Sequence, residues 1–342
     1  MLTWHTALCD LLHIEVPIIQ APIGGAATPA LVAAVSNAGG FGIFAMANRD
    51  PDDIRRVIDE ARRLTSRPFG ANFLLRPQEK TDARLEVCLE AGVPAVSFFW
   101  GDPAPYIARV HATGALVMYT VASVADARRA VEAGVDIIVA QGWEAGGHVR
   151  GEVAALPLVP QVVDAVAPTP VVAAGGIADG RGMAAALALG AAGVWMGTRF
   201  LVSTEAATHP VHRARLLQAS ETDVVYTGLF DVSWPEAPHR ALRNSTLMQW
   251  EAAGRPPSGR RPGEGEVIGQ SAEGRPIVRY RWLTPSVGTT GNIEAMSLGA
   301  GQSVGLVTRS QPAGDIVREV AEEAVRVLRH CAGLIQTEDK VA

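Results

Sequence analysis

Short apolar stretches rich in β-branched residues alternate with amphipathic or alanine-rich stretches along most of this chain. The first apolar stretch is followed by a segment with an N-capping threonine and a proline directly after it, which predicts a strand and then a helix. The same order continues as far as Met196. The strands that this pattern predicts are Pro17–Ala21, Phe41–Ala45, Gly70–Leu75, Ala95–Phe99, Leu116–Val121, Asp136–Ala140, Pro170–Ala174 and Gly193–Met196.

Helices are predicted between these strands from capping residues and from periodic apolar positions. Asp50 and Ser123 are predicted N-caps, and Pro51 follows Asp50 as the first helical residue. A last amphipathic segment, Asp315–Leu334, is predicted to complete the ring of helices. The other predicted helices are Thr28–Ala38, one that starts after Asp50, Glu79–Ala91, Pro105–Ala112, Val124–Ala133, Leu158–Ala167 and Asp179–Leu189.

Eight strand–helix units in this length favour a closed (β/α)8 barrel, the TIM barrel, over an open doubly wound sheet. We expect the barrel to comprise residues 1–202 and 306–342. Residues 203–305 break the alternation and contain Trp234, Trp250 and Trp282, so we expect an insertion that covers the C-terminal mouth of the barrel. Within it, the Arg-, Pro- and Gly-rich stretch Gly254–Gly265 is predicted to be a solvated loop.

Composition narrows the classes of partner. The 342 residues are 48% apolar and 19% charged, which suits one large core. The net charge of -5 comes from interspersed signs, and the apolar run Met183–Met196 is short and broken by glycines, so we expect no nucleic-acid or membrane partner. The N-terminal residues lack the pattern of a signal peptide, from which we expect a cytoplasmic location.

Cysteine and histidine spacing predicts neither disulfides nor a metal site. Cys9, Cys88 and Cys331 are scattered and have no CxxC spacing, so they are expected to be reduced thiols. His209 and His212 are three residues apart but have no third ligand nearby, and they are expected at the surface. We therefore expect the protein to need no metal.

Two kinds of loop after the predicted strands carry candidate chemistry. The stretch Gln141–Gly151 combines four glycines, which allow a ligand close to the backbone, with the polar or titratable side chains of Gln141, Glu144 and His148. Gly175–Gly176 and Gly197–Thr198 follow strands seven and eight, where barrels often bind phosphate. The alternatives are a solvent-facing histidine and glycines that only relieve tight turns. Phosphosugars, nucleotides and flavin mononucleotide (FMN) all suit such loops.

The motifs at the predicted mouth resemble the nitronate monooxygenase family, also called 2-nitropropane dioxygenases, which are FMN-dependent barrels. They are QAPIGG (20–25), GANF (70–73), QGWEAGGHVRG (141–151), AAGGIADG (173–180), WMGTRF (195–200) and AGQSVGL (300–306). The resemblance implies oxidation of nitroalkanes or nitronates by O2 to carbonyl compounds and nitrite, with His148 as the catalytic base. The predicted FMN contacts are Ala21, Pro22, Ile23, Gly24, Asn72, Gln141, Gly146, Gly147, Gly175, Gly176, Trp195, Met196, Gly197 and Thr198.

Other activities stay open at this point. The same barrel and the same EAGGH loop occur in flavin-dependent enoyl-ACP reductases and NADH:quinone reductases, in which NAD(P)H reduces the flavin and His148 would orient or protonate the substrate. A barrel of the inosine-monophosphate dehydrogenase type would need a cysteine in a mouth loop, and none of the three lies in one. A flavin- or phosphate-binding barrel without catalysis is a further alternative. The expected partners are a small-molecule substrate and O2, and a homodimer is the expected assembly.

Overall fold

A sheet of eight parallel strands lies at the centre of the protein, in the order β1-β9-β8-β6-β5-β4-β3-β2. The computed structural model describes residues 4–47, 49–76 and 80–335. A parallel bridge between Ile19 and Phe41 joins β1 to β2 and closes the sheet, so the predicted (β/α)8 barrel is confirmed. The barrel strands are β1 (Ile18–Gln20), β2 (Gly42–Ala45), β3 (Phe69–Leu74), β4 (Ala95–Phe99), β5 (Leu116–Val121), β6 (Ile137–Gln141), β8 (Val171–Ala174) and β9 (Gly193–Met196).

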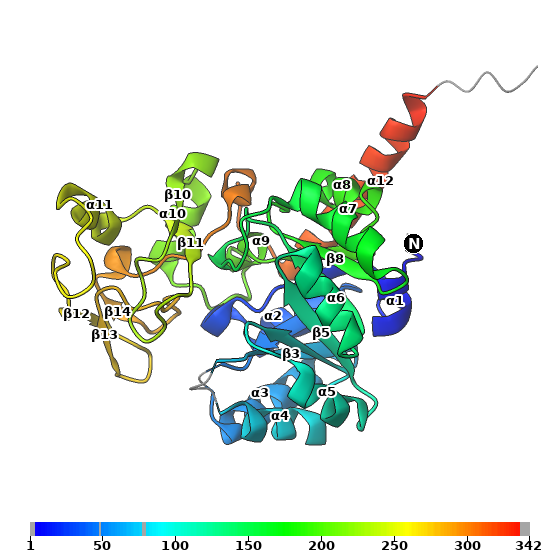
Figure 1. Cartoon of the computed structure of the whole chain (residues 1–342), viewed down its shortest axis with the longest axis horizontal. Coiled ribbons are helices and arrows are strands. Elements are labelled where there is room, and N and C mark those ends of the chain that lie inside the picture. The colour runs from blue at the N-terminus through cyan, green and yellow to red at the C-terminus, as the bar shows by residue number, and fades with distance from the viewer. Residues whose placement is uncertain (1–3, 48, 77–79, 336–342) are drawn as a thin grey trace, which may run out of the picture.

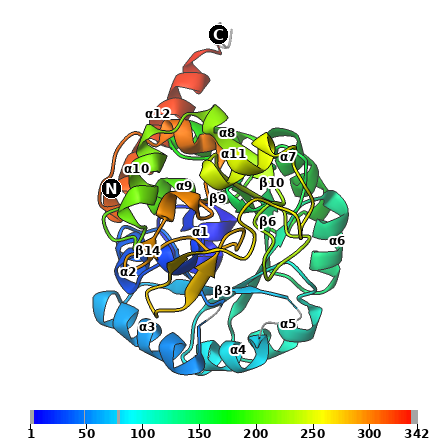
Figure 2. The same ribbon diagram turned by 90° about the vertical axis from the view of Figure 1, so that its left-hand side faces the viewer.

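Helices surround the barrel, as Figure 2 shows in a view along its axis. The closing helix α12 (Ala313–Gly333) packs between α8 and α2, so it completes the ring as the sequence predicts. A short helix, α9 (Thr198–Leu201), follows β9. The remaining barrel helices are α2 (Pro29–Asn37), α3 (Pro51–Leu64), α4 (Thr81–Glu90), α5 (Ala104–His111), α6 (Val124–Glu132), α7 (Ala155–Val166) and α8 (Gly180–Ala188).

Side-chain caps begin several of these helices where the sequence predicts them. The hydroxyl of Thr28 accepts a hydrogen bond from the Leu31 N–H (3.0 Å), and Asp50 and Ser123 cap α3 and α6 in the same way. The helix predicted at Leu158–Ala167 begins earlier, at Ala155, because the Glu144 carboxylate accepts from the Ala155 N–H (2.9 Å) and caps it from outside the segment. Glu79, the predicted start of α4, lies outside the described residues.

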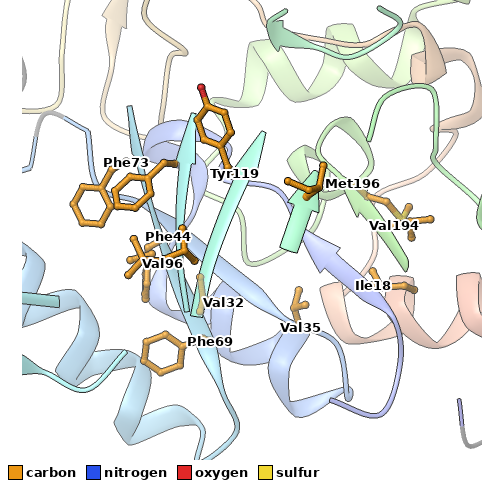
Figure 3. Packing of buried hydrophobic residues seen from close by; sticks show 14 of the residues in the cluster. Ile18, Val32, Val35, Phe44, Phe69, Phe73, Val96, Tyr119, Val194 and Met196 are labelled. Atoms are coloured by element: carbon orange, nitrogen blue, oxygen red, sulfur yellow. The ribbon is translucent and has the colours of Figure 1, made fainter. Parts of the chain in front are cut away.

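The apolar core lies between the outer face of the barrel and its helices. Figure 3 shows Phe44, Phe69 and Phe73 packed with valines of the strands and of α2. The strands are buried on both faces, which is why they read as continuous apolar runs rather than alternating ones. Inside the barrel a second cluster includes Leu8 and Leu12 of α1 (Ala7–Leu12), a helix that is not among those predicted from the sequence.

The segment 203–305 lies beyond the carboxyl ends of the strands, at the left of Figure 1 and in front of the barrel in Figure 2. Two small antiparallel sheets organise it: β10-β11 with β7, which comes from the loop after β6, and β13-β12-β14. Two short elements come from loops of the barrel itself, β7 (Gly147–His148) and the 3-10 helix η1 (Gly24–Ala26). The elements of the segment are α10 (Pro210–Gln218), η2 (Glu221–Asp223), β10 (Val224–Thr227), β11 (His239–Leu242), α11 (Ser245–Ala252), β12 (Val267–Gln270), β13 (Pro276–Val278), β14 (Thr290–Gly291) and η3 (Ile293–Ala295), followed at its end by η4 (Gln302–Leu306).

One prediction for this segment is wrong, and another holds with one exception, because the stretch Gly254–Gly265 is a mostly exposed loop that contains a buried arginine. Arg261, in the stretch predicted to be solvated, is buried: its guanidinium pairs with Asp231 (2.7 Å) and with Glu264, and lies over the Tyr280 ring. His212, predicted at the surface, is 0% exposed, because α10 packs that side against residues of the 293–306 stretch. In both cases tertiary contacts bury a polar side chain whose local sequence is hydrophilic.

Candidate active site

A cavity of about 1320 Å³ opens at the carboxyl ends of the barrel strands and extends under the segment 203–305. This is where parallel barrels carry their chemistry, because the loops after all eight strands converge there. With one exception, every residue assigned to cofactor or catalysis from the sequence lines it: Ala21, Pro22, Ile23, Gly24, Asn72, Gln141, Gly146, Gly147, His148, Gly175, Gly176, Trp195, Gly197 and Thr198.

Met196 is the exception. Its side chain is 0% exposed and packs in the core between the sheet and the helices, where Figure 3 shows it beside Val194. Successive side chains of a strand point to opposite faces, and Trp195 faces the cavity, so Met196 must face away from it. The prediction that Met196 lines the cofactor site is therefore wrong for its side chain.

His148 is held by backbone pairing with the segment 203–305. The two-residue strand β7 pairs with β11, which sets His148 opposite His239 and Gly147 opposite Arg240. Gly147 has φ 73°, a left-handed conformation that glycine adopts without strain, and it turns the chain so that the imidazole lines the cavity. The Gln141 side chain braces the same loop: its Nε2 donates to the His148 carbonyl (3.0 Å), and its Oε1 accepts from the Arg150 N–H (3.3 Å).

One carbonyl fixes the tautomers of two histidines. Nδ1 of His148 lies 3.2 Å from the Ala237 oxygen, and Nδ1 of His239 lies 3.1 Å from the same atom. A carbonyl oxygen only accepts hydrogen bonds, so each Nδ1 carries the proton and each neutral ring keeps a lone pair on Nε2. Both Nε2 atoms are buried and have no hydrogen-bond partner within the described residues.

The surroundings of His148 keep its ring neutral. Its pKa is lowered to about 3, mainly by burial and also by charge repulsion from His239 and Arg76. Burial likewise lowers the pKa of His239 to about 4. At neutral pH the imidazole of His148 is therefore uncharged, and its Nε2 atom is a proton acceptor.

Three tryptophans surround this ring. The centroid of the His148 ring lies 4.2 Å from that of Trp234, 4.7 Å from Trp282 and 6.0 Å from Trp100. Trp100 follows β4, whereas the other two come from the segment 203–305. In the sequence, Trp234 and Trp282 stand out only as features of an insertion, and neither they nor Trp100, Ala237 and His239 are predicted as parts of the site. Nothing in the local sequence marks those five as neighbours of His148.

The loops after β8 and β9 offer hydrogen-bond donors to an anion. Among the described residues, the backbone N–H groups of Gly176, Ile177 and Thr198 have no protein acceptor, and all three residues line the cavity. Gly175 and Gly176 have φ values of 96° and 75°, which only glycine adopts readily. Several backbone N–H groups that have no protein acceptor and belong to residues lining one cavity can bind a phosphate.

Glycines also let the later AGQSVGL stretch approach the histidine loop. A Cβ atom on Gly146 would lie 2.4 Å from the Gly301 nitrogen and 2.5 Å from the Ala300 carbonyl carbon. The Gly301 N–H donates to the Thr198 hydroxyl (3.0 Å) and the Gln302 N–H to the Glu144 carbonyl (2.9 Å). Stretches that lie 100 or more residues apart in sequence are thus joined around one wall of the cavity.

On the opposite wall Asn72 donates through Nδ2 to the hydroxyl of Ser97 (3.1 Å) and to its carbonyl. These bonds use the donor side of the amide, and its oxygen is an acceptor. No group of three or more His, Cys, Asp or Glu side chains in the described parts of the chain could hold a metal ion. Nor does any described helix have the length and apolar character to cross a membrane.

Comparison with known proteins agrees with this architecture. The chain matches the nitronate monooxygenase family over residues 5–84 and 77–323. It is 40% identical over 253 residues (73% of this chain and 70% of the relative) to the (3aS,4S,5R,7aS)-5-hydroxy-7a-methyl-1-oxo-octahydro-1H-indene-4-carboxyl-CoA dehydrogenase of Mycobacterium tuberculosis.

Two solved structures superpose over nearly the whole chain. FabK from Thermotoga maritima has a TM-score of 0.82 and 38% identity over 97% of this chain and 100% of that one. The nitroalkane oxidase from Streptomyces ansochromogenes has a TM-score of 0.76 and 29% identity over 96% of this chain and 100% of that one. The chain is therefore an oxidoreductase and belongs to the nitronate monooxygenase family.

Proposed function

We propose that this protein is an FMN-dependent enzyme that oxidises nitronates with O2 to carbonyl compounds and nitrite, and that it accepts nitroalkanes after removing their α-proton. The observation that carries the proposal is the fixed tautomer of His148. Its Nδ1 donates its proton to the Ala237 carbonyl, so the buried Nε2 atom is the proton acceptor of a residue that lines the cavity. A nitroalkane is a carbon acid, and the proton from its α-carbon would move to Nε2 as the nitronate forms.

The low pKa of His148 shapes the substrate preference. A ring with a pKa of about 3 stays neutral but is a weak base on its own. The negative nitronate that forms beside it would stabilise the imidazolium, because an adjacent opposite charge favours the charged form of a histidine. A nitronate from solution needs no such step. We therefore expect nitronates to react faster than the corresponding nitroalkanes.

The cavity residues fit FMN. The N–H groups around Gly175–Gly176 and Gly197–Thr198 suit its phosphate, while Asn72, Ala21–Gly24 and the loop at Gly146–Gly147 suit its ring system. Gln141 lines the cavity, but its amide is engaged by the histidine loop, so its proposed part is to hold that loop. Bound FMN would supply the two-electron oxidant and the centre that reacts with O2.

A reductase of a thioester or quinone, with NAD(P)H as electron donor, is the second candidate. Its support is the 40% identity to a dehydrogenase whose name specifies a CoA thioester. In that reaction His148 would have to donate a hydrogen bond or a proton to the substrate. The tautomer set by Ala237 leaves no proton on Nε2, which favours a base that deprotonates a nitroalkane over a proton donor to a thioester or quinone.

The test compares electron donors. The purified protein should be yellow, and under anaerobic conditions a nitronate should bleach the flavin rapidly while NAD(P)H does so slowly. In air, nitrite should form together with a carbonyl product. Rapid bleaching by NAD(P)H with no reaction towards nitro compounds would replace the first proposal by the second. A colourless protein that binds no added FMN would eliminate both.

A further inference from the structure

The Nε2 atom of His148 is covered in this structure. It is buried, although the residue as a whole is only half-buried and lines the cavity. Of the rings around the His148 imidazole, that of Trp234 is the nearest, at a distance of 4.2 Å between the two ring centroids. A substrate that gives a proton to Nε2 must come within hydrogen-bond distance of that atom. One of the surrounding side chains must therefore move before the substrate can reach it.

Trp282 is held in place on several sides. Its ring centroid lies 4.5 Å from that of His239, with the two rings tilted by 45°. A Cβ atom on Gly299 would lie 3.4 Å from the indole, so the backbone packs directly on it. The next residue, Leu283, donates its N–H to the Ser297 hydroxyl (2.8 Å). Trp282 is thus part of the fixed wall. Trp100 is farther from His148, at 6.0 Å, and its ring meets it edge-on.

Trp234 lies instead on a short segment whose two ends are fixed. Asp231 is fixed by its ion pair with buried Arg261 (2.7 Å), and Ala237 by the two histidines that donate to its carbonyl. Between these ends, Ser233 and Glu236 have φ values of 76° and 61°. Residues other than glycine rarely adopt this left-handed conformation, and when they do it often marks a functional clamp or switch.

Several contacts hold the Trp234 segment against the rest of the site. Val232 donates its N–H to the Tyr280 carbonyl (3.1 Å), and the Trp234 N–H donates to the Asp231 carbonyl (3.0 Å) within the turn. The Trp234 ring also meets the Trp100 ring edge-on, at a centroid distance of 5.1 Å. The Arg76 guanidinium lies over the indole at 4.6 Å, a cation–π contact from the barrel to the segment. Ser233 and Glu236 are the two positions at which rotation towards ordinary φ values would relieve backbone strain.

We infer that Trp234 is a specificity-determining gate that covers Nε2 of His148 and must swing away, on hinges at Ser233 and Glu236, before a substrate can contact that atom. Substrate and indole compete for the same face of the imidazole. A substrate's apparent affinity is then reduced by the fraction of molecules in which the gate is open. Narrow nitro compounds need a small displacement of the indole, whereas branched or aromatic ones need a full opening.

Chemical modification of His148 tests the covering directly. Diethyl pyrocarbonate acylates the unprotonated nitrogen of an imidazole, and peptide mass spectrometry reports the rate at His148 separately from the other histidines. Minor conformations are commonly populated at roughly 0.1–10%, so Trp234→Ala should raise the His148 rate by roughly 10- to 1,000-fold. Trp234→Phe, which keeps a smaller ring, should give a lesser increase.

Trp250→Ala is the matched control, because Trp250 belongs to the same segment but binds Pro256 and Arg255 rather than His148. It should leave the His148 rate unchanged. Circular dichroism and flavin content establish that each variant is folded. Equal rates in the wild type and in both folded Trp234 variants would refute the gate. So would an equal acceleration by Trp250→Ala.

Substrate selection is the second readout, and it rests on the proposed oxidation of nitro compounds. Trp234→Ala should raise kcat/KM more for a bulky aromatic nitronate than for ethyl nitronate. Unchanged relative rates would refute a role in specificity even if His148 becomes more reactive. If neither compound is oxidised by the wild type while His148 still becomes accessible in Trp234→Ala, the proposed function fails and the gate stands.

Discussion

Replacement of Gly197 by alanine separates the proposed phosphate site from the stability of the fold. A Cβ atom at this position would lie 3.6 Å from the Ala21 Cβ and 3.8 Å from the Ile23 side chain, which are ordinary contacts. The backbone φ of Gly197 is -107°, so alanine needs no strained conformation. We therefore expect the free energy of unfolding of the flavin-free protein to stay within roughly 0.5 kcal/mol of the wild type.

Flavin affinity should respond differently. Gly197 lines the cavity directly before the Thr198 N–H, which has no acceptor among the described residues, so a methyl group there would push an anion away from this donor. A hydrogen bond to a charged group contributes roughly 1.5–3 kcal/mol. Loss of one such bond weakens binding by roughly 10- to 150-fold. Gly176 is a poorer position for this test, because its φ of 75° would strain any other residue.

The assay is titration of flavin-stripped protein with FMN, followed by quenching of flavin fluorescence, together with thermal unfolding of the same preparations. Gly228→Ala is the matched control: this glycine is exposed, a Cβ atom added to it would have no described atom within 4 Å, and it does not line the cavity. It should change neither quantity. If Gly197→Ala binds FMN as tightly as the wild type, the phosphate does not lie at this loop.

Three further predictions concern the histidines and the glycine loop. His148→Ala should lose roughly 10²–10⁴ in rate with a neutral nitroalkane but keep most of its activity with the nitronate, as measured by stopped-flow bleaching of the flavin; equal losses on both would assign His148 a binding role instead. Gly146→Ala should destabilise the protein by roughly 1–3 kcal/mol in urea denaturation, since its methyl would lie 2.4 Å from the Gly301 nitrogen; unchanged stability would mean that the two loops can separate. Burial lowers the pKa of His212 to about 4, below its unfolded value, so the unfolded chain binds more protons below about pH 6.5 and stability is lost as the pH falls. Between pH 7 and pH 5 this one residue should account for about 2 kcal/mol of the loss, so His212→Leu should show a smaller pH dependence by that amount; identical pH profiles would contradict it.

The barrel could be predicted because its information is local. β-Branched runs give the strands, and caps such as Thr28, Asp50 and Ser123 give the starts of helices. The face of a strand on which a side chain lies is harder to predict when both faces are apolar. In GVWM (193–196) no alternation of polarity tells which of Trp195 and Met196 points into the barrel, and the resemblance of the WMGTRF motif implies a cofactor contact for both.

The segment 203–305 shows a different limit. Its polar side chains look solvent-exposed from their neighbours in sequence, yet Arg261 and His212 are buried by partners at a distance. Arg261 contacts Asp231, 30 residues away. The glycines and prolines next to Arg261 in the sequence do not predict that pairing. Burial of a charged side chain depends on whether a partner is available to pair with it, and that is a property of the fold.

The chemistry of His148 depends on the fold in the same way. The sequence points to His148 as the candidate for proton exchange, because a histidine in a glycine-rich loop after a strand is a local feature. Which nitrogen carries the proton is decided by the Ala237 carbonyl, 89 residues later, and every residue has a carbonyl. The pairing of β7 with β11 brings this oxygen to Nδ1 and leaves the lone pair on Nε2. The difference between a base that removes a proton and a donor that supplies one therefore lies in a backbone contact, which no side-chain motif records.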